Sequence, residues 1–188
     1  MKHSNELLTL PNLITYVRLA LLPVIFWVLL AQRHELALAL LFLAALGDAL
    51  DGWLARLLDQ ATRLGALLDP IADKLTVVGV SLILAWQGWL PAWLVAAIVA
   101  RDVVIVGGAA AYRRLRGRVD MAPTRLSKLN TALEFLLLVL VLAVASRWIA
   151  AGPWLLPLLV GVLATVVASG AQYVWLWGRK AWRGKAGL

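Results

Sequence analysis

The sequence has no cysteine, only two histidines and two methionines, and little charge for its length. The absence of cysteine excludes disulfide frameworks, thiol catalysis and cysteine-based zinc sites. Charged side chains make up 15% of the 188 residues and apolar ones 63%, which excludes intrinsic disorder because disorder requires low hydrophobicity. The composition therefore indicates a membrane protein rather than a soluble domain.

Long apolar runs make up most of the chain. A helix needs about 20 mostly apolar residues to cross a bilayer. Six stretches meet this requirement: 13–31, 36–58, 66–87, 90–112, 127–146 and 154–177. They predict an all-α integral membrane protein with six transmembrane helices, forming a single domain over residues 1–188. No small-residue cleavage site follows the first stretch, so we expect a permanent helix there and not a signal peptide.

The basic residues outside these stretches and near their ends are unevenly divided between the two sides of the membrane. With six spans, thirteen of them share one side: Lys2, Arg56, Arg63, Arg113, Arg114, Arg116, Arg118, Arg125, Lys128, Arg179, Lys180, Arg183 and Lys185. Only Arg33 and Arg147 fall on the other side. This bias predicts that both termini face the cytoplasm. We expect the basic loops to contact anionic lipid and not nucleic acid, because no soluble domain remains to form a groove.

Several charged residues fall inside or near the predicted spans, where they are costly and usually functional. They are Arg18, Asp48, Asp51, Asp69, Asp73, Lys74, Arg101, Asp102 and Glu134. Asp48 and Asp51 are three positions apart, and Asp69 and Asp73 are four apart, so each pair shares one face of its helix. A rise of about 1.5 Å per residue places the two pairs at similar depth.

Four carboxylates gathered at one depth require compensating positive charge. A ligand set of oxygens alone favours Mg²⁺ or Mn²⁺ over zinc. In an alternative interpretation the carboxylates form only structural ion pairs with Arg18, Lys74 and Arg101. A transporter is a second alternative, because intramembrane carboxylates also mark ion pathways, although the chain has no second copy of the aspartate string.

The aspartates belong to one extended pattern. It reads Asp48-x-x-Asp51-Gly52-x-x-Ala55-Arg56, then eight residues, Gly65, three residues, Asp69, three residues and Asp73. At every fixed position this string resembles the signature of the CDP-alcohol phosphatidyltransferase family. The resemblance implies six membrane helices, transfer of a phosphatidyl or alcohol-phosphate group from a cytidine diphosphate carrier to a hydroxyl, release of CMP, and a homodimer.

The resemblance also implies roles for the residues of this string. Asp48, Asp51 and Asp69 would be ligands of two divalent ions, Mg²⁺ or Mn²⁺. Asp73 would be a further ligand and the base that accepts the proton of the acceptor hydroxyl.

The other fixed positions would bind the donor nucleotide. Gly52 and Ala55 are small, which lets a nucleotide approach the helix backbone closely. Arg56 can offer a planar fork of donors to phosphate oxygens, or can be another residue that sets the topology. Gly65 would take part in donor binding, although a role in a turn or in close helix packing is the stronger interpretation.

Three further segments resemble the branch of the family that makes phosphatidylglycerophosphate and cardiolipin. They are Leu10-Pro11-Asn12-x-x-Thr15-x-x-Arg18, Leu68-Asp69-Pro70-Ile71-Ala72-Asp73-Lys74 and Ala100-Arg101-Asp102. The segments Pro123 to Thr131 and Tyr173 to Lys180 are more similar to the CMP-forming enzymes that make cardiolipin. The neutral Asn130 favours phosphatidylglycerol as the acceptor over glycerol 3-phosphate, whose second phosphate charge calls for another cation. Glycerol 3-phosphate is the alternative acceptor.

The candidates for binding the acceptor phosphate are Arg18, Arg101, Ser127, Lys128 and Asn130. Arg101 could instead pair with Asp102 or Glu134. The two histidines, His3 and His34, lie in terminal or loop positions and are assigned no role. No Arg-rich amphipathic import segment stands at the N-terminus, so we expect a bacterial cytoplasmic membrane, with the active site facing the cytoplasm.

Overall fold

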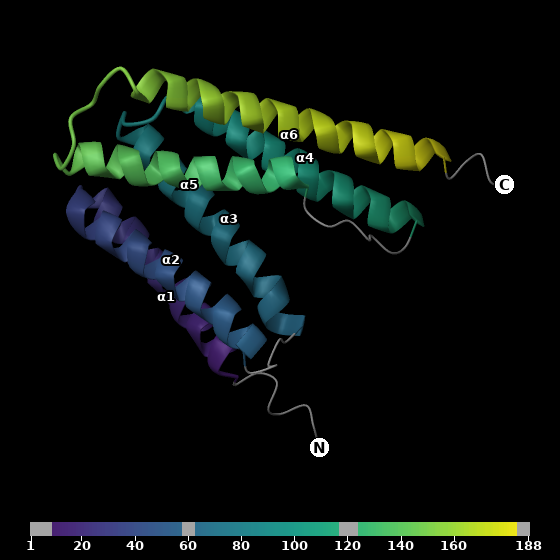
Figure 1. Cartoon of the computed structure of the whole chain (residues 1–188), viewed down its shortest axis with the longest axis horizontal. Coiled ribbons are helices and arrows are strands. Elements are labelled where there is room, and N and C mark those ends of the chain that lie inside the picture. Colours follow the sequence, from purple (N-terminus) through teal and green to yellow (C-terminus); the bar gives the residue numbers. More distant parts are fainter. Residues whose placement is uncertain (1–8, 58–62, 117–123, 184–188) are drawn as a thin grey trace. The chain divides into compact units, whose positions relative to one another are not determined.

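The computed structural model describes residues 9–57, 63–116 and 124–183. Within these residues the chain forms six α-helices and no β-strand (Figure 1). The helices are α1 (Leu10–Leu30), α2 (His34–Leu57), α3 (Arg63–Trp86), α4 (Ala92–Arg116), α5 (Arg125–Ala145) and α6 (Leu155–Arg183). The all-α prediction is confirmed. Each helix follows its predicted apolar stretch to within a few residues, except that α6 continues past residue 177 to Arg183.

The chain divides into two compact units. The first contains residues 1–89 and 138–150, and the second contains residues 90–137 and 151–188. The divisions fall between Trp89 and Leu90, just before α4, and between Leu137 and Leu138, inside α5.

In the first unit, α1 packs against both α2 and α3. Only Ala31–Arg33 separate α1 from α2, and Gln32 takes a left-handed conformation with φ of 57° that reverses the chain. The Arg33 amide donates a 3.1 Å hydrogen bond to the Val28 carbonyl and closes this turn. The two helices therefore form a hairpin. Its buried core includes Ile25, Leu29, Leu38 and Leu41.

A glycine allows α3 to approach α1 closely. A Cβ atom added at Gly79 would lie 2.6 Å from Cε1 of Phe26, closer than real Cβ atoms come to their neighbours. The Phe26 ring therefore occupies the space that any side chain at position 79 would need.

In the second unit, α4 packs against α6. A Cβ atom added at Gly108 would lie 3.1 Å from Nε1 of Trp177, so a larger residue would crowd this side chain. Ile98 and Val162 are among the buried apolar side chains of this unit.

The outer surfaces of the helices are apolar. Val17, Val103 and Leu156 are each 60% or more exposed, as expected for side chains that face lipid instead of water. Four described segments are long and apolar enough to cross a membrane: Asn12–Leu30, Ala92–Ala111, Arg125–Ala145 and Leu155–Trp177. They belong to α1, α4, α5 and α6, whereas α2 and α3 carry the aspartates of the sequence pattern.

Candidate active site

The first unit brings three of the four predicted aspartates to one guanidinium group. Nη1 of Arg18 donates to Oδ1 of Asp48 and, over 2.9 Å, to Oδ1 of Asp73. Nη2 of Arg18 donates to Oδ1 of Asp69 over 3.1 Å. Asp69 also accepts a 3.0 Å hydrogen bond from Oγ1 of Thr15. We call Arg18, Asp48, Asp69 and Asp73 the acidic cluster.

Helix geometry assembles this cluster. Thr15 and Arg18 are three positions apart on α1, so both side chains reach the same side of that helix. Asp69 and Asp73 are one turn apart on α3 and likewise share a face. Because α1 packs against both α2 and α3, its Arg18 lies within reach of carboxylates from both helices.

Burial differs sharply within the acidic cluster. The Arg18 side chain is 4% exposed, whereas the side chains of Asp48, Asp69 and Asp73 are 45%, 37% and 48% exposed. The cation therefore lies beneath the carboxylates, and the carboxylates border open space.

The acidic cluster suits a hard divalent ion in its donor chemistry, because carboxylate oxygens from two helices converge and no sulfur or imidazole is among them. Among the described residues, no three His, Cys, Asp or Glu side chains are arranged by themselves as a metal site. The guanidinium of Arg18 lies where the three carboxylates converge, and it supplies part of the positive charge that they require.

For four predicted site residues of α2, the prediction cannot be compared with side-chain positions. Asp51, Gly52, Ala55 and Arg56 lie within α2, but their side chains are outside the described residues. Gly65 lies near the start of α3 and is buried, a position compatible with the packing role considered for it.

The second unit contains a buried polar network centred on Arg101. Its Nη1 donates to Oδ1 of Asp102 over 2.7 Å, and its Nη2 donates to Oγ of Ser127 over 2.6 Å and to Oγ of Ser169 over 2.8 Å. Arg101 is only 4% exposed and Ser169 is fully buried. The structural pairing of Arg101 with Asp102 that the sequence left open is therefore present, and the guanidinium joins α4 to α5 and α6.

Asn130 also lies inside this unit. Its Nδ2 donates to Oε1 of Glu134 over 2.7 Å, and its Oδ1 accepts a 3.0 Å hydrogen bond from Oγ1 of Thr165. Asn130 has no exposed surface and Glu134 is 2% exposed. The bond with Thr165 holds α5 to α6, whereas the bond with Glu134 lies within α5 itself. Both ends of the Asn130 amide are thus engaged by the protein itself.

Lys128 differs from the other candidates for acceptor binding because it is exposed at the start of α5. The amide of Ser127 donates to Oγ1 of Thr124 over 3.1 Å, which caps this helix start. The Lys128 ammonium is therefore presented on an ordered helical turn and is accessible to a ligand.

Comparison with known proteins identifies the family of this chain. The model of the CDP-alcohol phosphatidyltransferase family matches residues 8–175. The chain belongs to the CDP-alcohol phosphatidyltransferase family. The matched range contains the complete aspartate pattern and the residues of both polar networks.

Individual proteins named as cardiolipin synthases are also similar to this chain. The chain is 34% identical over 157 residues to the cardiolipin synthase (CMP-forming) of Streptomyces coelicolor, covering 78% of this chain and 71% of that protein. It is 32% identical over 152 residues to the human cardiolipin synthase (CMP-forming), covering 72% of this chain and 50% of that protein. A Mycobacterium bovis protein is 40% identical over 105 residues, which are 55% of this chain and half of that protein. The match thus spans only about half the length of some of these relatives.

Two polar residues of this phosphatidyltransferase were not predicted as site residues, although each contacts one that was. Thr15 binds Asp69, and Ser169 binds Arg101. Thr15 lies three positions before Arg18, and this spacing could have placed both residues on the same helix face. Ser169 is a polar residue inside an apolar span, which is a weaker signal because serine is tolerated in membrane helices for packing as well.

Proposed function

We propose that this chain transfers a phosphatidyl group from CDP-diacylglycerol to a hydroxyl of phosphatidylglycerol, giving cardiolipin and CMP. The observation that supports this most directly is the convergence of Asp48, Asp69 and Asp73, all partly exposed, on the buried guanidinium of Arg18 in a member of this family. The relatives named cardiolipin synthase (CMP-forming) support the choice of acceptor and product. Glycerol 3-phosphate remains the alternative acceptor.

In this proposal Asp48, Asp51, Asp69 and Asp73 hold divalent ions, Mg²⁺ or Mn²⁺, in keeping with the general divalent-metal dependence of the family. Two such ions would neutralise the diphosphate of the donor and polarise the phosphorus that is attacked. Thr15 orients the Asp69 carboxylate through its hydrogen bond. Arg18 holds the carboxylates of two helices together from below.

Other residues of the pattern are proposed to bind the donor nucleotide and to accept the proton of the acceptor hydroxyl. Gly52, Ala55, Arg56 and Gly65 bind the nucleotide of CDP-diacylglycerol, with the small residues leaving room for it along the helix. Asp73 takes the proton of the acceptor hydroxyl through a carboxylate oxygen. The hydroxyl oxygen then forms the new bond to phosphorus, and the bond between phosphorus and the CMP oxygen breaks, with its electron pair leaving on CMP.

The acceptor phosphate is assigned to Ser127 and the exposed Lys128, with Arg18, Arg101 and Asn130 as supporting residues. The contacts of Arg101 and Asn130 within the protein favour a positioning role for both, because they fix the start of α5 against α4 and α6. A phosphodiester carries a single charge, which one lysine can balance.

The proposed topology has six spans, with both termini and the acidic cluster on the cytoplasmic side of a bacterial cytoplasmic membrane. The four apolar segments and the basic connections support it. In this topology α2 and α3 also cross the membrane and carry their aspartates near its cytoplasmic face. A homodimer is part of the same proposal, on the basis of the family alone.

The decisive experiment supplies both acceptors to the purified chain in detergent. CDP-diacylglycerol and Mg²⁺ are combined with phosphatidylglycerol or with glycerol 3-phosphate, and CMP release and lipid products are measured side by side. We expect cardiolipin with phosphatidylglycerol and little reaction with glycerol 3-phosphate. Preferential formation of phosphatidylglycerophosphate would overturn the acceptor while leaving metal-dependent transfer intact. No CMP release with either acceptor would favour the transporter alternative instead.

A further inference from the structure

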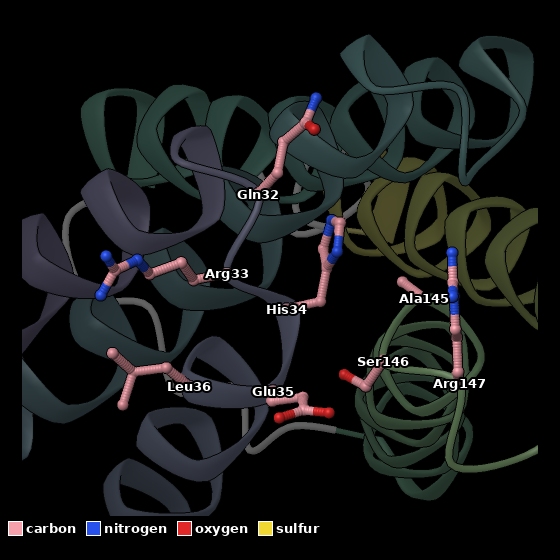
Figure 2. A pocket seen from close by; sticks show the side chains of 8 residues that line it. All are labelled: Gln32, Arg33, His34, Glu35, Leu36, Ala145, Ser146 and Arg147. Carbon is pink, nitrogen blue, oxygen red and sulfur yellow. The ribbon is translucent and has the colours of Figure 1, made fainter.

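A polar pocket of about 420 Å³ lies in the first unit, at the end of the helices remote from the acidic cluster. It is lined by the α1–α2 connection with the start of α2, and by the end of α5 with the residues that follow: Gln32, Arg33, His34, Glu35, Leu36, Ala145, Ser146 and Arg147. Figure 2 shows Ser146 and Arg147 facing His34 and Glu35, whereas the Arg33 side chain is directed away from them. Its volume falls in the range of small-ligand sites.

Glu35 and Arg147 line the pocket and do not neutralise each other, while the side chain of Arg33, the other charged residue of the lining, is directed away. Glu35 and Arg147 are both exposed, and within the described residues no ion pair joins them. Ser146 is 8% exposed, and its buried Oγ has no hydrogen-bond partner. A buried hydroxyl is normally satisfied by a protein group or by a ligand. In Figure 2 the Ser146 hydroxyl points toward Glu35, into this pocket.

His34 adds an acceptor to the lining. Nε2 of Gln87 donates to the Leu29 carbonyl over 2.6 Å, so Oε1 of Gln87 is the atom left to face His34. That oxygen can only accept a hydrogen bond. Nε2 of His34 therefore carries the ring proton and donates it to Oε1 of Gln87 over 3.1 Å. Nδ1 of the neutral ring then has a lone pair for a donor. Trp89 fixes the ring from its edge, with centroids 5.6 Å apart.

The pocket lies beside the ends of helices that are long and apolar enough to cross a membrane. Two of the four candidate spans, Asn12–Leu30 and Arg125–Ala145, end beside it. Trp27 and Trp148 lie near these two helix ends and are 66% and 62% exposed. Exposed tryptophans at helix ends are typical of the membrane–water interface, where lipid headgroups lie.

From these observations we propose that the pocket binds the headgroup of a zwitterionic phospholipid with a primary ammonium, such as an ethanolamine headgroup. Arg147 and the Ser146 hydroxyl would take the phosphodiester, and Glu35 and Nδ1 of His34 would take the ammonium. A wholly anionic headgroup leaves Glu35 unpaired, and a trimethylated ammonium has no N–H for the histidine to accept.

This lipid site is separate from the reaction. His34 and Asp48 are fourteen positions apart on α2, which corresponds to about 21 Å along the helix. A substrate bound at the acidic cluster therefore does not reach the pocket, and the lipid proposed here is a bound component of the membrane and not a reactant.

The test measures lipid adducts on the whole chain by native mass spectrometry. The protein is incubated with equal amounts of phosphatidylethanolamine, phosphatidylglycerol and phosphatidylcholine. We expect Glu35→Gln and Arg147→Asn each to lower retention of phosphatidylethanolamine about tenfold, as loss of a charge-assisted hydrogen bond predicts, and to leave phosphatidylglycerol unchanged. Asn is chosen because position 147 has φ of 62°, a left-handed conformation that Asn tolerates.

Arg33→Gln is the matched control, because Arg33 belongs to the same connection but points away, and it should keep wild-type retention. Wild-type retention in Glu35→Gln and Arg147→Asn, or an equal loss of phosphatidylglycerol, would overturn the proposal. Free phosphoethanolamine is titrated separately. If it binds as tightly as the lipid does, the site belongs to a soluble phosphate ester and the lipid assignment is overturned. Circular dichroism of each variant checks that the helices persist.

Discussion

Arg18 and Asp73, 55 positions apart in sequence, are joined by a 2.9 Å hydrogen bond between Nη1 and Oδ1. The same nitrogen also contacts Asp48. One buried cation on α1 thus connects the two helices that carry the aspartate pattern. The sequence left two interpretations of the aspartates open, a metal site or structural ion pairs with Arg18, and the geometry makes them compatible: the arginine contacts the carboxylates from below, and their exposed sides stay open.

Replacing Arg18 by Gln removes the charge that three carboxylates share. We expect a lower melting temperature in EDTA, by about 2–8 °C for a loss of about 1–2 kcal/mol. Mg²⁺ should recover most of this loss, because it supplies the missing positive charge. Differential scanning fluorimetry with and without Mg²⁺ measures both effects. Arg33→Gln, which replaces an exposed arginine near the other end of α1, is the control and should change neither the melting temperature nor its response to Mg²⁺. An Arg18→Gln variant whose melting temperature is lowered but does not rise with Mg²⁺ would contradict the prediction.

Asn substitution at Asp48, Asp51 or Asp69 should abolish CMP release while the protein still purifies as a folded species. The proposed reason is the shared metal site, because a neutral amide balances no charge on the ions and their affinity falls. CMP release over a range of Mg²⁺ concentrations, with size-exclusion chromatography as a folding check, measures this. Glu35→Gln is the control, as it removes an acidic side chain from the opposite end of α2. Near-normal turnover in any one Asp variant would remove that residue from the ligand set.

Asp73→Asn should lose turnover but keep donor binding. A general base acts after the donor is in place, and its removal typically costs about 10² to 10⁴ in rate. Calorimetric titration with CDP-diacylglycerol in the presence of Mg²⁺, set beside the same titration of Asp48→Asn, separates binding from chemistry. If the two variants lose donor affinity equally, Asp73 acts only as a ligand.

Asn130 and Thr165 should be energetically coupled. Asn130→Ala removes one of the two acceptors of the Thr165 hydroxyl, which also contacts the Val162 carbonyl, and it removes the amide donor of Glu134. We therefore expect it to lower the free energy of unfolding by about 1–3 kcal/mol. The double-mutant cycle with Thr165→Val should give a coupling of about 1 kcal/mol, in the range of hydrogen bonds inside membrane proteins. Thermal unfolding of the four proteins supplies the cycle. Strict additivity would show that the bond contributes nothing measurable.

The sequence predicted the helices and the meeting of Asp48 with Asp69 and Asp73, because apolar length and helical spacing are local properties. It did not predict that Asn130 is fully enclosed between Glu134 and Thr165, since that depends on which face of α6 packs against α5. The prediction for His34 was wrong in part, because this residue opens α2 instead of lying in a loop. The pocket beside it depends on residues more than 110 positions later in the chain, which no local pattern reveals.

The short turn between α1 and α2 bears on how the protein enters the membrane. If α1 and α2 both cross, as the proposed topology has it, Arg18 and Asp48 belong to the two arms of one hairpin and can leave water together as a neutral pair. Each would cost about 3 kcal/mol if it were inserted alone. Asp69 and Asp73 follow with α3 and would meet an arginine that is already in place. In the proposed topology the order of synthesis would thus deliver the cation before all three carboxylates of the acidic cluster, and the contact that organises the candidate active site would also favour membrane insertion.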